Sequence, residues 1–371
     1  MKICIISYLY PTKENKTLGL FVHHQARELA KNNEVHIITK RYGNMPDYEL
    51  VDGVKVHRIN RFNLALQNKI ASLHGKIKFE IIHSHFLGFS TLLCGIASRM
   101  LRLPFVVTLH GSEIMSASAI KKIYLSFADR IMCVSKYTAH LAENITDKGK
   151  ITIISNGVDT ERLKAKRKAD LFKKQIGLAN NHILLSVADL VKRKGIDTVI
   201  KALPSVKNNH PDLAYIIIGK GPEKDNLISL AKKLKIDKNI RLVGYVSDEG
   251  LSNYYNACDV FELMSRTLQK ENAVEGFGIV FIEASLFKKP VIAGKSGGTS
   301  DAVINGVTGF LVDPDDKNEL QEKINMLLKN PELRKRLGIN GKNFVMKNML
   351  WKHNARKTID VYKDAMRIRH Q

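Results

Sequence analysis

The sequence predicts an α/β protein with two doubly wound parallel sheets. Its 371 residues exceed what one small core needs and suit two domains. Short apolar runs alternate with amphipathic stretches over residues 1–155, and a second alternating set runs from 182 to 349. The runs at 106–109 and 151–154 lack polar–apolar alternation, which is typical of parallel strands covered on both faces.

The first alternating set begins with the chain itself. The opening apolar run is short and β-branched and ends in a loop, so we expect a first strand there and not a signal peptide. Strands are expected at 2–7, 34–39, 54–59, 79–84, 104–109, 130–134 and 151–154, and helices at 20–32, 63–78, 88–101, 117–127 and 136–145.

A turn at 155–159, Ser-Asn-Gly-Val-Asp, is expected to link the two sets. The basic run 162–174 that follows is expected to be a solvated surface. In the second set, strands are expected at 183–187, 214–218, 240–243, 259–263, 290–293 and 310–312. Helices are expected at 195–209, 222–235, 248–257, 278–287, 298–304, 316–329 and 331–347, with a last basic helix at 351–369.

The composition is that of a globular chain. The apolar fraction is 44%, and no apolar run is long enough to span a bilayer. Four scattered cysteines (Cys4, Cys94, Cys133 and Cys258) have neither metal-site nor redox-pair spacing. We therefore expect reduced core cysteines in a cytoplasmic protein.

The charge balance predicts an anionic partner, because 59 basic residues face 36 acidic ones and the formal net charge is +23. We find no zinc finger, RNA-recognition aromatic pair or recognition-helix pattern, so no nucleic acid is expected as a partner. An anionic membrane surface and a polyanionic nucleotide donor remain as candidate partners.

A basic amphipathic segment at 61–80 bears on the membrane alternative. Leu66, Ile70, Leu73 and Ile77 recur at helical spacing, among the basic residues Arg61, Lys69, Lys76 and Lys78. Such a helix either lies on an anionic membrane or packs its apolar stripe on the sheet, and core packing is the commoner outcome. Lys121-Lys122, beside Ile120, Ile123 and Tyr124, is a second and weaker membrane candidate.

A ligand site is expected at 271–285. Gly276 and Gly278 allow backbone to approach a ligand, and the first amides of the apolar helix that follows favour an anion. Glu283 follows Glu275 by eight residues, about two helical turns. The pattern indicates a site for phosphate and hydroxyl groups; an ordinary glycine-capped loop before a buried helix is the alternative.

Other polar and glycine residues fall at expected strand ends, where doubly wound sheets bind ligands. They are Gly19, His83 and His85, His110-Gly111 with Glu113, and Gly219-Lys220-Gly221-Pro222. His83 and His85 point to one face and could chelate a metal, but no carboxylate or cysteine set accompanies them. The family resemblance that follows implies that they help to shape an acceptor cleft.

These motifs resemble those of the family 4 retaining glycosyltransferases over nearly the whole chain. Glu275 to Glu283 reproduces the Glu-x7-Glu signature of the family, and 289–293, 296–298 and 306–314 are similar to the rest of its C-terminal half. The resemblance implies the GT-B fold, two Rossmann-like domains facing each other across a cleft. Domain boundaries are expected at 1–160 (acceptor binding), 161–349 (nucleotide-sugar binding) and 350–371, a helix that crosses back onto the first domain with Trp351 as a packing anchor.

The resemblance also implies roles for individual residues. His110 and Glu275 would fix the transferred sugar, and Lys194 would neutralise charge on the leaving diphosphate. Glu283 would bind the ribose hydroxyls. The other expected donor-binding residues are Gly19, Arg193, Gly219, Gly221, Val246, Gly276, Phe277 and Gly278.

One position departs from the family pattern. Where members carry an Arg five residues before the Lys, this chain has Asp189, so Arg193 or Lys192 is expected to supply the second cation. No Asp-x-Asp is placed to hold a metal, and we expect neither metal nor cofactor.

The expected activity is transfer of a hexosyl residue from a nucleotide-diphosphate sugar to a lipid-linked or saccharide hydroxyl, with retention of configuration. Cell-surface glycan, lipopolysaccharide, exopolysaccharide or glycolipid synthesis is the expected setting, in the cytoplasm or on the inner face of the plasma membrane.

Two alternative functions are also considered. The Asp189 departure favours a catalytically silent nucleotide- or anion-binding protein at the membrane surface; a GT-B sugar-nucleotide 2-epimerase would not carry the Glu-x7-Glu neighbourhood. The motifs do not specify the sugar, nucleotide or acceptor.

Overall fold

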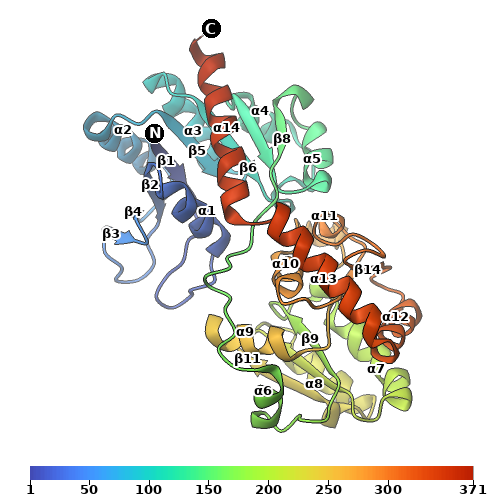
Figure 1. Ribbon diagram of the computed structural model, residues 1–371. Coiled ribbons are helices and arrows are strands. Elements are labelled where there is room, and N and C mark those ends of the chain that lie inside the picture. The colour runs from blue at the N-terminus through green and yellow to red at the C-terminus, as the bar shows by residue number, and fades with distance from the viewer. Residues whose placement is uncertain (371) are drawn as a thin grey trace. The chain divides into compact units, whose positions relative to one another are not determined.

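The computed structural model describes residues 1–370 and divides them into two compact units (Figure 1). Unit 1 comprises Met1–Gly157 together with the helix that begins at Trp351, and unit 2 is the continuous segment Val158–Leu350. The chain passes between the units after Gly157 and after Leu350, next to the boundaries expected at 160 and 349.

Unit 1 contains an eight-stranded sheet in the order β3-β4-β2-β1-β5-β6-β7-β8. All neighbouring strands are parallel except the edge pair β3 and β4. The order reverses between β1 and β5, which is where doubly wound sheets bind ligands. The strands are β1 (Lys2–Ile6), β2 (Glu34–Lys40), β3 (Tyr48–Val51), β4 (Val54–Ile59), β5 (Ile81–His85), β6 (Phe105–Leu109), β7 (Arg130–Cys133) and β8 (Ile151–Ile153).

Helices cover both faces of this sheet, so its central strands β1, β5 and β6 are buried along almost their whole length. Alternate residues of β1 separate the two cores: Ile3 and Ile5 pack with α1 and α14, while Cys4 and Ile6 pack with the α2–α5 side. The helices are α1 (Leu20–Ala30), α2 (Leu64–Ile77), α3 (Phe89–Leu101), α4 (Ala119–Ser126), α5 (Lys136–Glu143) and α14 (Trp351–His370), with 3-10 turns η1 (Ser112–Ile114) and η2 (Lys148–Lys150).

Unit 2 contains a six-stranded sheet in the order β11-β10-β9-β12-β13-β14, all parallel. Its reversal point lies between β9 and β12, so the loops after these two strands are the expected ligand site. The strands are β9 (Ile183–Val187), β10 (Ala214–Ile218), β11 (Ile240–Gly244), β12 (Val260–Leu263), β13 (Val291–Gly294) and β14 (Gly309–Val312).

The helices of unit 2 again follow the strands. α7 contacts α8 and α12, while α10 contacts α13. They are α6 (Ala169–Gln175), α7 (Ile196–Asn209), α8 (Lys224–Lys233), α9 (Asp248–Ala257), α10 (Ile279–Leu286), α11 (Thr299–Ala302), α12 (Lys317–Lys329) and α13 (Pro331–Asn348), with 3-10 turns η3 (Lys192–Lys194), η4 (Asp237–Asn239) and η5 (Gln269–Glu271).

The expected fold class is confirmed, and most expected elements lie within a few residues of their observed bounds. Two elements were not predicted, β3 and α6. The prediction that 162–174 is a solvated surface holds for most of its basic residues, which are exposed. It is wrong for Arg162, which enters a buried ion pair, and the segment also buries Leu163 and Phe172. A segment can carry many charges and still bury the few apolar side chains that hold it.

Other predictions about packing are confirmed. The four cysteines are free and buried, and Trp351 is buried in unit 1 beside His24. The stripe of α2 packs into the core, with Leu66 and Ile70 fully buried and Leu73 and Ile77 packed against the same cluster. Among the described residues, no helix has the length and apolar character that crossing a membrane requires.

Candidate active site

Glu275, the first of the two predicted carboxylates, contacts two basic residues in unit 2. Glu275, on the loop before α10, is almost fully buried, and its Oε2 lies 2.5 Å from Lys194 Nζ and 3.6 Å from Arg193 Nη1. Ser265 Oγ donates to the same oxygen at 3.3 Å. Burial alone would raise the pKa of Glu275, but Lys194 and then Arg193 outweigh it and hold the pKa below its usual value. The cluster of one carboxylate and two cations therefore keeps a net positive charge.

The turn that opens α10 adds unpaired donors to this cluster. Gly278 is the N-cap residue and has φ +89°, a left-handed conformation that favours glycine. The first amides of α10 have no partner inside the helix, so they attract an anion. Phe277 points its side chain into the core and contributes only its main chain to the surface. Positive charge and open amides suit a phosphate-bearing ligand.

Glu283, on α10, has different partners from Glu275. Tyr255 from α9 donates its hydroxyl to Oε2 at 2.9 Å, and the Arg162 guanidinium pairs with Oε1. Arg162 also pairs with Asp248 at 2.6 Å. Burial lowers the pKa of Arg162, but Glu283 and Asp248 outweigh it and the pKa is raised. The two predicted carboxylates are therefore both held in fixed orientations by cations, Glu275 by Lys194 and Arg193 and Glu283 by Arg162.

The glycines of the β10–α8 loop are required by backbone packing. A Cβ on Gly219 would lie 1.8 Å from the carbonyl oxygen of Ala188, and one on Gly221 would lie 2.4 Å from that of Leu190. The expectation that the amides of this loop face phosphate is wrong for Gly219, whose N–H donates to Gly244 O at 2.9 Å. The loop after β10 is thus locked against the loop after β9.

The structure leaves Asp189 exposed, and no ion pair of its carboxylate is found among residues 1–370. Arg266, a residue not singled out in the sequence, pairs with Asp197 and with Asp315 (3.2 Å) and donates Nε to Lys192 O at 3.1 Å. Because Arg266 is engaged in this way, Arg193 is the guanidinium that accompanies Lys194. Val246 lies just after β11 and is half-buried.

In unit 1, His110 follows β6 in a tight turn. Its backbone N–H donates to Glu113 Oε1 at 2.6 Å, so the Glu that replaces the more usual Asp closes this turn. The ring is surrounded by Phe21 and Phe86, whose centroids lie 4.8 and 4.4 Å away. Burial lowers the pKa of His110 to about 3, so the ring is neutral at pH 7. Phe86 has φ +68°, a strained conformation for an aromatic residue next to a site.

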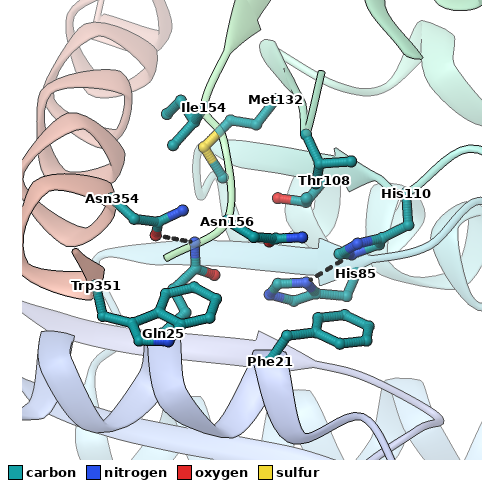
Figure 2. Close-up of a pocket in the computed structure, with 11 residues that line it drawn as sticks. Phe21, Gln25, His85, Thr108, His110, Met132, Ile154, Asn156, Trp351 and Asn354 are labelled. Atoms are coloured by element: carbon teal, nitrogen blue, oxygen red, sulfur yellow. Dashed lines mark hydrogen bonds between the residues drawn. The ribbon is translucent and has the colours of Figure 1, made fainter. Parts of the chain in front are cut away.

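His110 is joined to an interior cavity through His85. His85 Nδ1 lies 3.1 Å from His110 Nε2, while His85 Nε2 is buried without a partner among the described residues (Figure 2). Gln25 Oε1 from α1 is likewise buried and unpaired; its Nε2 donates to Asn354 Oδ1 on α14 at 2.7 Å. The cavity, which Trp351 also lines, measures about 10 Å³, roughly the space of one buried water.

The two strand histidines differ in role. The expectation that both shape an acceptor cleft is wrong for His83, which is fully buried between Tyr362 OH and Thr108 Oγ1, each at 2.7 Å. Gly19, with φ +60°, precedes α1; a Cβ there would lie 2.4 Å from Leu9 O. Among the residues that the structure describes, no group of three His, Cys, Asp or Glu side chains could hold a metal.

Sequence reasoning missed Arg162, Tyr255, Gln25 and Asn354. Arg162 follows the linker turn inside a basic run, and nothing local sets it apart from its neighbours. Gln25 and Asn354 are 329 residues apart and meet only through the fold. The available signal was the position of Arg162 directly after a turn that joins two domains.

Comparisons with known proteins cover both units. The family described as Glycosyltransferase Family 4 matches residues 18–162, and Glycosyl transferases group 1 matches 167–344. An uncharacterised glycosyltransferase of Methanocaldococcus jannaschii is 30% identical over 98% of each chain. A GDP-mannose-dependent alpha-(1-6)-phosphatidylinositol monomannoside mannosyltransferase of Mycolicibacterium smegmatis is 27% identical over 88% of this chain and 89% of its own.

Solved structures share the fold. A glycosyltransferase from Rickettsia africae superposes with a TM-score of 0.83 at 22% identity, over 98% of each chain. HepE from Anabaena, solved with UDP, gives a TM-score of 0.81 at 21% identity over 98% of this chain and 100% of its own. Relatives of full length and matches in both units lead to one conclusion: this chain belongs to the family 4 glycosyltransferases.

Proposed function

We propose that the protein transfers a hexosyl residue from a nucleotide-diphosphate sugar to a hydroxyl acceptor, with retention of the anomeric configuration. The observation that carries this proposal is the placement of Lys194 and Arg193 together on Glu275, beside the open amides of α10. A diphosphate leaving group requires positive charge that is already in place when the glycosidic bond breaks.

We assign the residues roles that the family resemblance implies and that this geometry supports. Lys194 and Arg193 neutralise the leaving diphosphate, while amides of 276–278 bind its oxygens. Glu275 holds both cations in position and accepts a hydrogen bond from the sugar. Glu283 accepts hydrogen bonds from the ribose. His110, neutral and confined between aromatic rings, contacts the sugar through its ring.

The proposed donor and acceptor are consistent with the names of similar proteins. The mycobacterial relative is named for GDP-mannose and a phosphatidylinositol mannoside, and HepE was solved with UDP. A lipid-linked or saccharide acceptor in cell-surface glycan or glycolipid synthesis fits such relatives and a chain with net charge +23.

The test is a thermal-shift and calorimetry panel with UDP, GDP, ADP and their common sugar conjugates. A ligand at 100 times its Kd should stabilise the folded protein by about 2.7 kcal/mol. We expect one nucleotide to stabilise the wild type and Glu283→Ala and Lys194→Ala each to lose that shift. NMR of the product formed from the matching sugar nucleotide then reports the anomeric configuration; an inverted product would refute retention.

If the protein is instead a catalytically silent binding protein, the same panel should give a different result. Binding of a nucleotide with no transfer or hydrolysis of its sugar would favour it. Interconversion of the sugar nucleotide itself, without an acceptor, would favour a 2-epimerase. We propose that no metal is needed, because Lys194 and Arg193 supply the charge; transfer should then be unchanged by a chelator.

We also propose that unit 1 docks on an anionic bilayer at the cytoplasmic side of the plasma membrane. The α2 stripe is buried, so α4 is the better candidate: Ile120 and Ile123 are 54% and 55% exposed, with Lys122 between them. Exposed apolar side chains beside cations suit an anionic lipid surface.

Sedimentation with vesicles tests this surface. The protein should bind phosphatidylglycerol vesicles and not phosphatidylcholine vesicles, and a double change of Ile120 and Ile123 to Ser should release it. Leu64→Ser, which alters a still more exposed residue of α2 (69%), is the control and should bind as the wild type does. Equal release by both variants would contradict a role for α4.

A further inference from the structure

The buried carboxylate of Glu283 has two protein donors and still has acceptor capacity. Its side chain is 6% exposed, with Arg162 on Oε1 and the Tyr255 hydroxyl on Oε2. A carboxylate offers about four lone-pair sites, two on each oxygen. No other donor to these two oxygens is found among residues 1–370, so each oxygen keeps one site open.

Arg162 is held firmly where the chain enters unit 2. Asp159 Oδ1 accepts the backbone N–H groups of Glu161 and Arg162 at 2.9 and 3.1 Å, which fixes the turn that carries the arginine. One residue earlier, Val158 N–H donates to Met349 O at 2.8 Å. The arginine side chain is 13% exposed and bridges Glu283 to Asp248. It is therefore anchored through its backbone and through both carboxylates.

A buried carboxylate that loses its cation partner is costly to the fold. Without Arg162, Glu283 would keep only the Tyr255 hydroxyl as a donor, and its carboxyl plane would be free to rotate about its bond to the chain. The orientation of Glu283 thus depends on a residue that needs no contact with the ligand.

We propose that Arg162, assisted by Tyr255, is a positioning residue that holds the Glu283 carboxylate in one orientation and presents its open lone-pair sites to a vicinal diol. In the proposed function, on which this inference rests, that diol is the ribose 2′,3′-diol of the donor nucleotide. Arg162 is specific for this task because its planar fork binds Glu283 and Asp248 together, which a lysine cannot do.

Calorimetry of paired nucleotides tests the proposal. Each of UDP, GDP and ADP is compared with its 2′,3′-dideoxy form. For the nucleotide that binds, the ratio is the Kd of the dideoxy form divided by the Kd of the parent nucleotide. A hydroxyl bound to a charged carboxylate contributes about tenfold or more in affinity. We expect a ratio of at least that size for the wild type and a ratio near one for Arg162→Met.

Two further variants make smaller changes to the buried side chains, so that a lower ratio in them cannot be ascribed to misfolding. Tyr255→Phe retains the buried ring beside Phe261 and Phe287 and should also lower the ratio. Arg162→Lys should give an intermediate value. The control is Arg334→Met in α13, a half-buried arginine whose Nη1 contacts only the carbonyls of Leu327 and Leu328; it should keep the wild-type ratio.

The outcomes separate this inference from the proposed function. A merely structural role for Arg162 would weaken both nucleotides equally and leave the ratio unchanged, which would overturn the inference while nucleotide binding stands. A wild-type ratio near one would overturn it as well. No binding of any nucleotide would overturn the inference and the proposed function together.

Discussion

At the residue scale, Glu262 on β12 is an ionisable group that the proposed chemistry does not use. It is fully buried, Ser186 Oγ lies 2.5 Å from its Oε1, and its Oε2 has no partner among the described residues. Burial raises the pKa of Glu262 to about 7, against a smaller lowering by Ser186 and Tyr215. As a neutral acid it donates to Ser186 Oγ, and Ser186 then donates to the Glu262 carbonyl oxygen, 2.9 Å away.

Glu262 should make stability fall as pH rises. A carboxyl whose pKa is about 7 when folded and 4.5 in its reference state binds more protons in the folded protein. Its contribution is therefore fully present below pH 4.5 and lost by about pH 7, a change of about 3 kcal/mol. Urea unfolding at several pH values should show this fall in the wild type and not in Glu262→Gln. Parallel profiles for the two proteins would contradict the assignment.

The candidate site was predictable at some residues and not at others. The glycine-containing loop indicated Glu275, while Lys194 and Arg193 were expected from the resemblance to the family 4 glycosyltransferases. Their mutual ion pairs are within unit 2 and agree with a shared task. The partner of Glu283 was not predictable, since Arg162 lies 121 residues away and its local sequence resembles solvated surface.

At the scale of elements, the loops of unit 2 pack backbone against backbone. Gly219 has φ +145°, and its hypothetical Cβ would collide with Ala188 O. Such contact is open only to glycine, whatever the ligand. The loop after β9 that receives Gly219 and Gly221 also leads to Lys194, so the packing fixes the start of the segment that carries this cation.

Gly219→Ala should destabilise unit 2 by about 2–4 kcal/mol, because it combines a strained φ with a backbone clash. Gly177→Ala is the matched control: Gly177 also has a positive φ, +67°, but a Cβ there meets nothing within 4 Å. It should cost only about 1 kcal/mol. Urea unfolding of both variants measures the difference, and equal losses would show that backbone strain alone explains the glycine.

The two elements that were not predicted, β3 and α6, differ in how clearly the sequence indicates them. β3 is joined to β4 by Asp52-Gly53, both with positive φ (49° and 81°), which is the two-residue turn that an Asp-Gly pair favours. The β3–β4 hairpin could therefore have been predicted from the sequence. α6 lies in a basic run with Phe172 as its one buried residue, so its position depends on tertiary contacts such as Lys173 with Asp259 at 2.9 Å.

At the scale of the whole molecule, unit 1 is built from two distant stretches of chain. Tyr362 and Ala365 on α14 are fully buried in the same core as Ile3 and Ile5 on β1. Arg130 and Asp364 add an ion pair at 2.5 Å. Unit 2, in contrast, is one uninterrupted segment.

A chain ending at Leu350 should therefore damage unit 1 and spare unit 2. Removal of α14 exposes Ile3, Ile5 and their neighbours to water and leaves His83 without the Tyr362 hydroxyl. Hydrogen exchange followed by mass spectrometry should show lost protection in β1 and β5 and retained protection in β9 and β10. Tyr362→Phe, which keeps the ring, is the mild control; loss of protection in both units would contradict independent cores.

The divided construction of unit 1 has a consequence for how the protein is made. The strands of unit 1 precede unit 2 in the chain, yet α14, which covers part of one face of their sheet, follows unit 2. Unit 2 can close its core as soon as its own segment has been synthesised, because every strand it needs lies within Val158–Leu350. During synthesis, the part of the unit 1 sheet that α14 covers therefore stays exposed to water until α14 has been made, after all of unit 2.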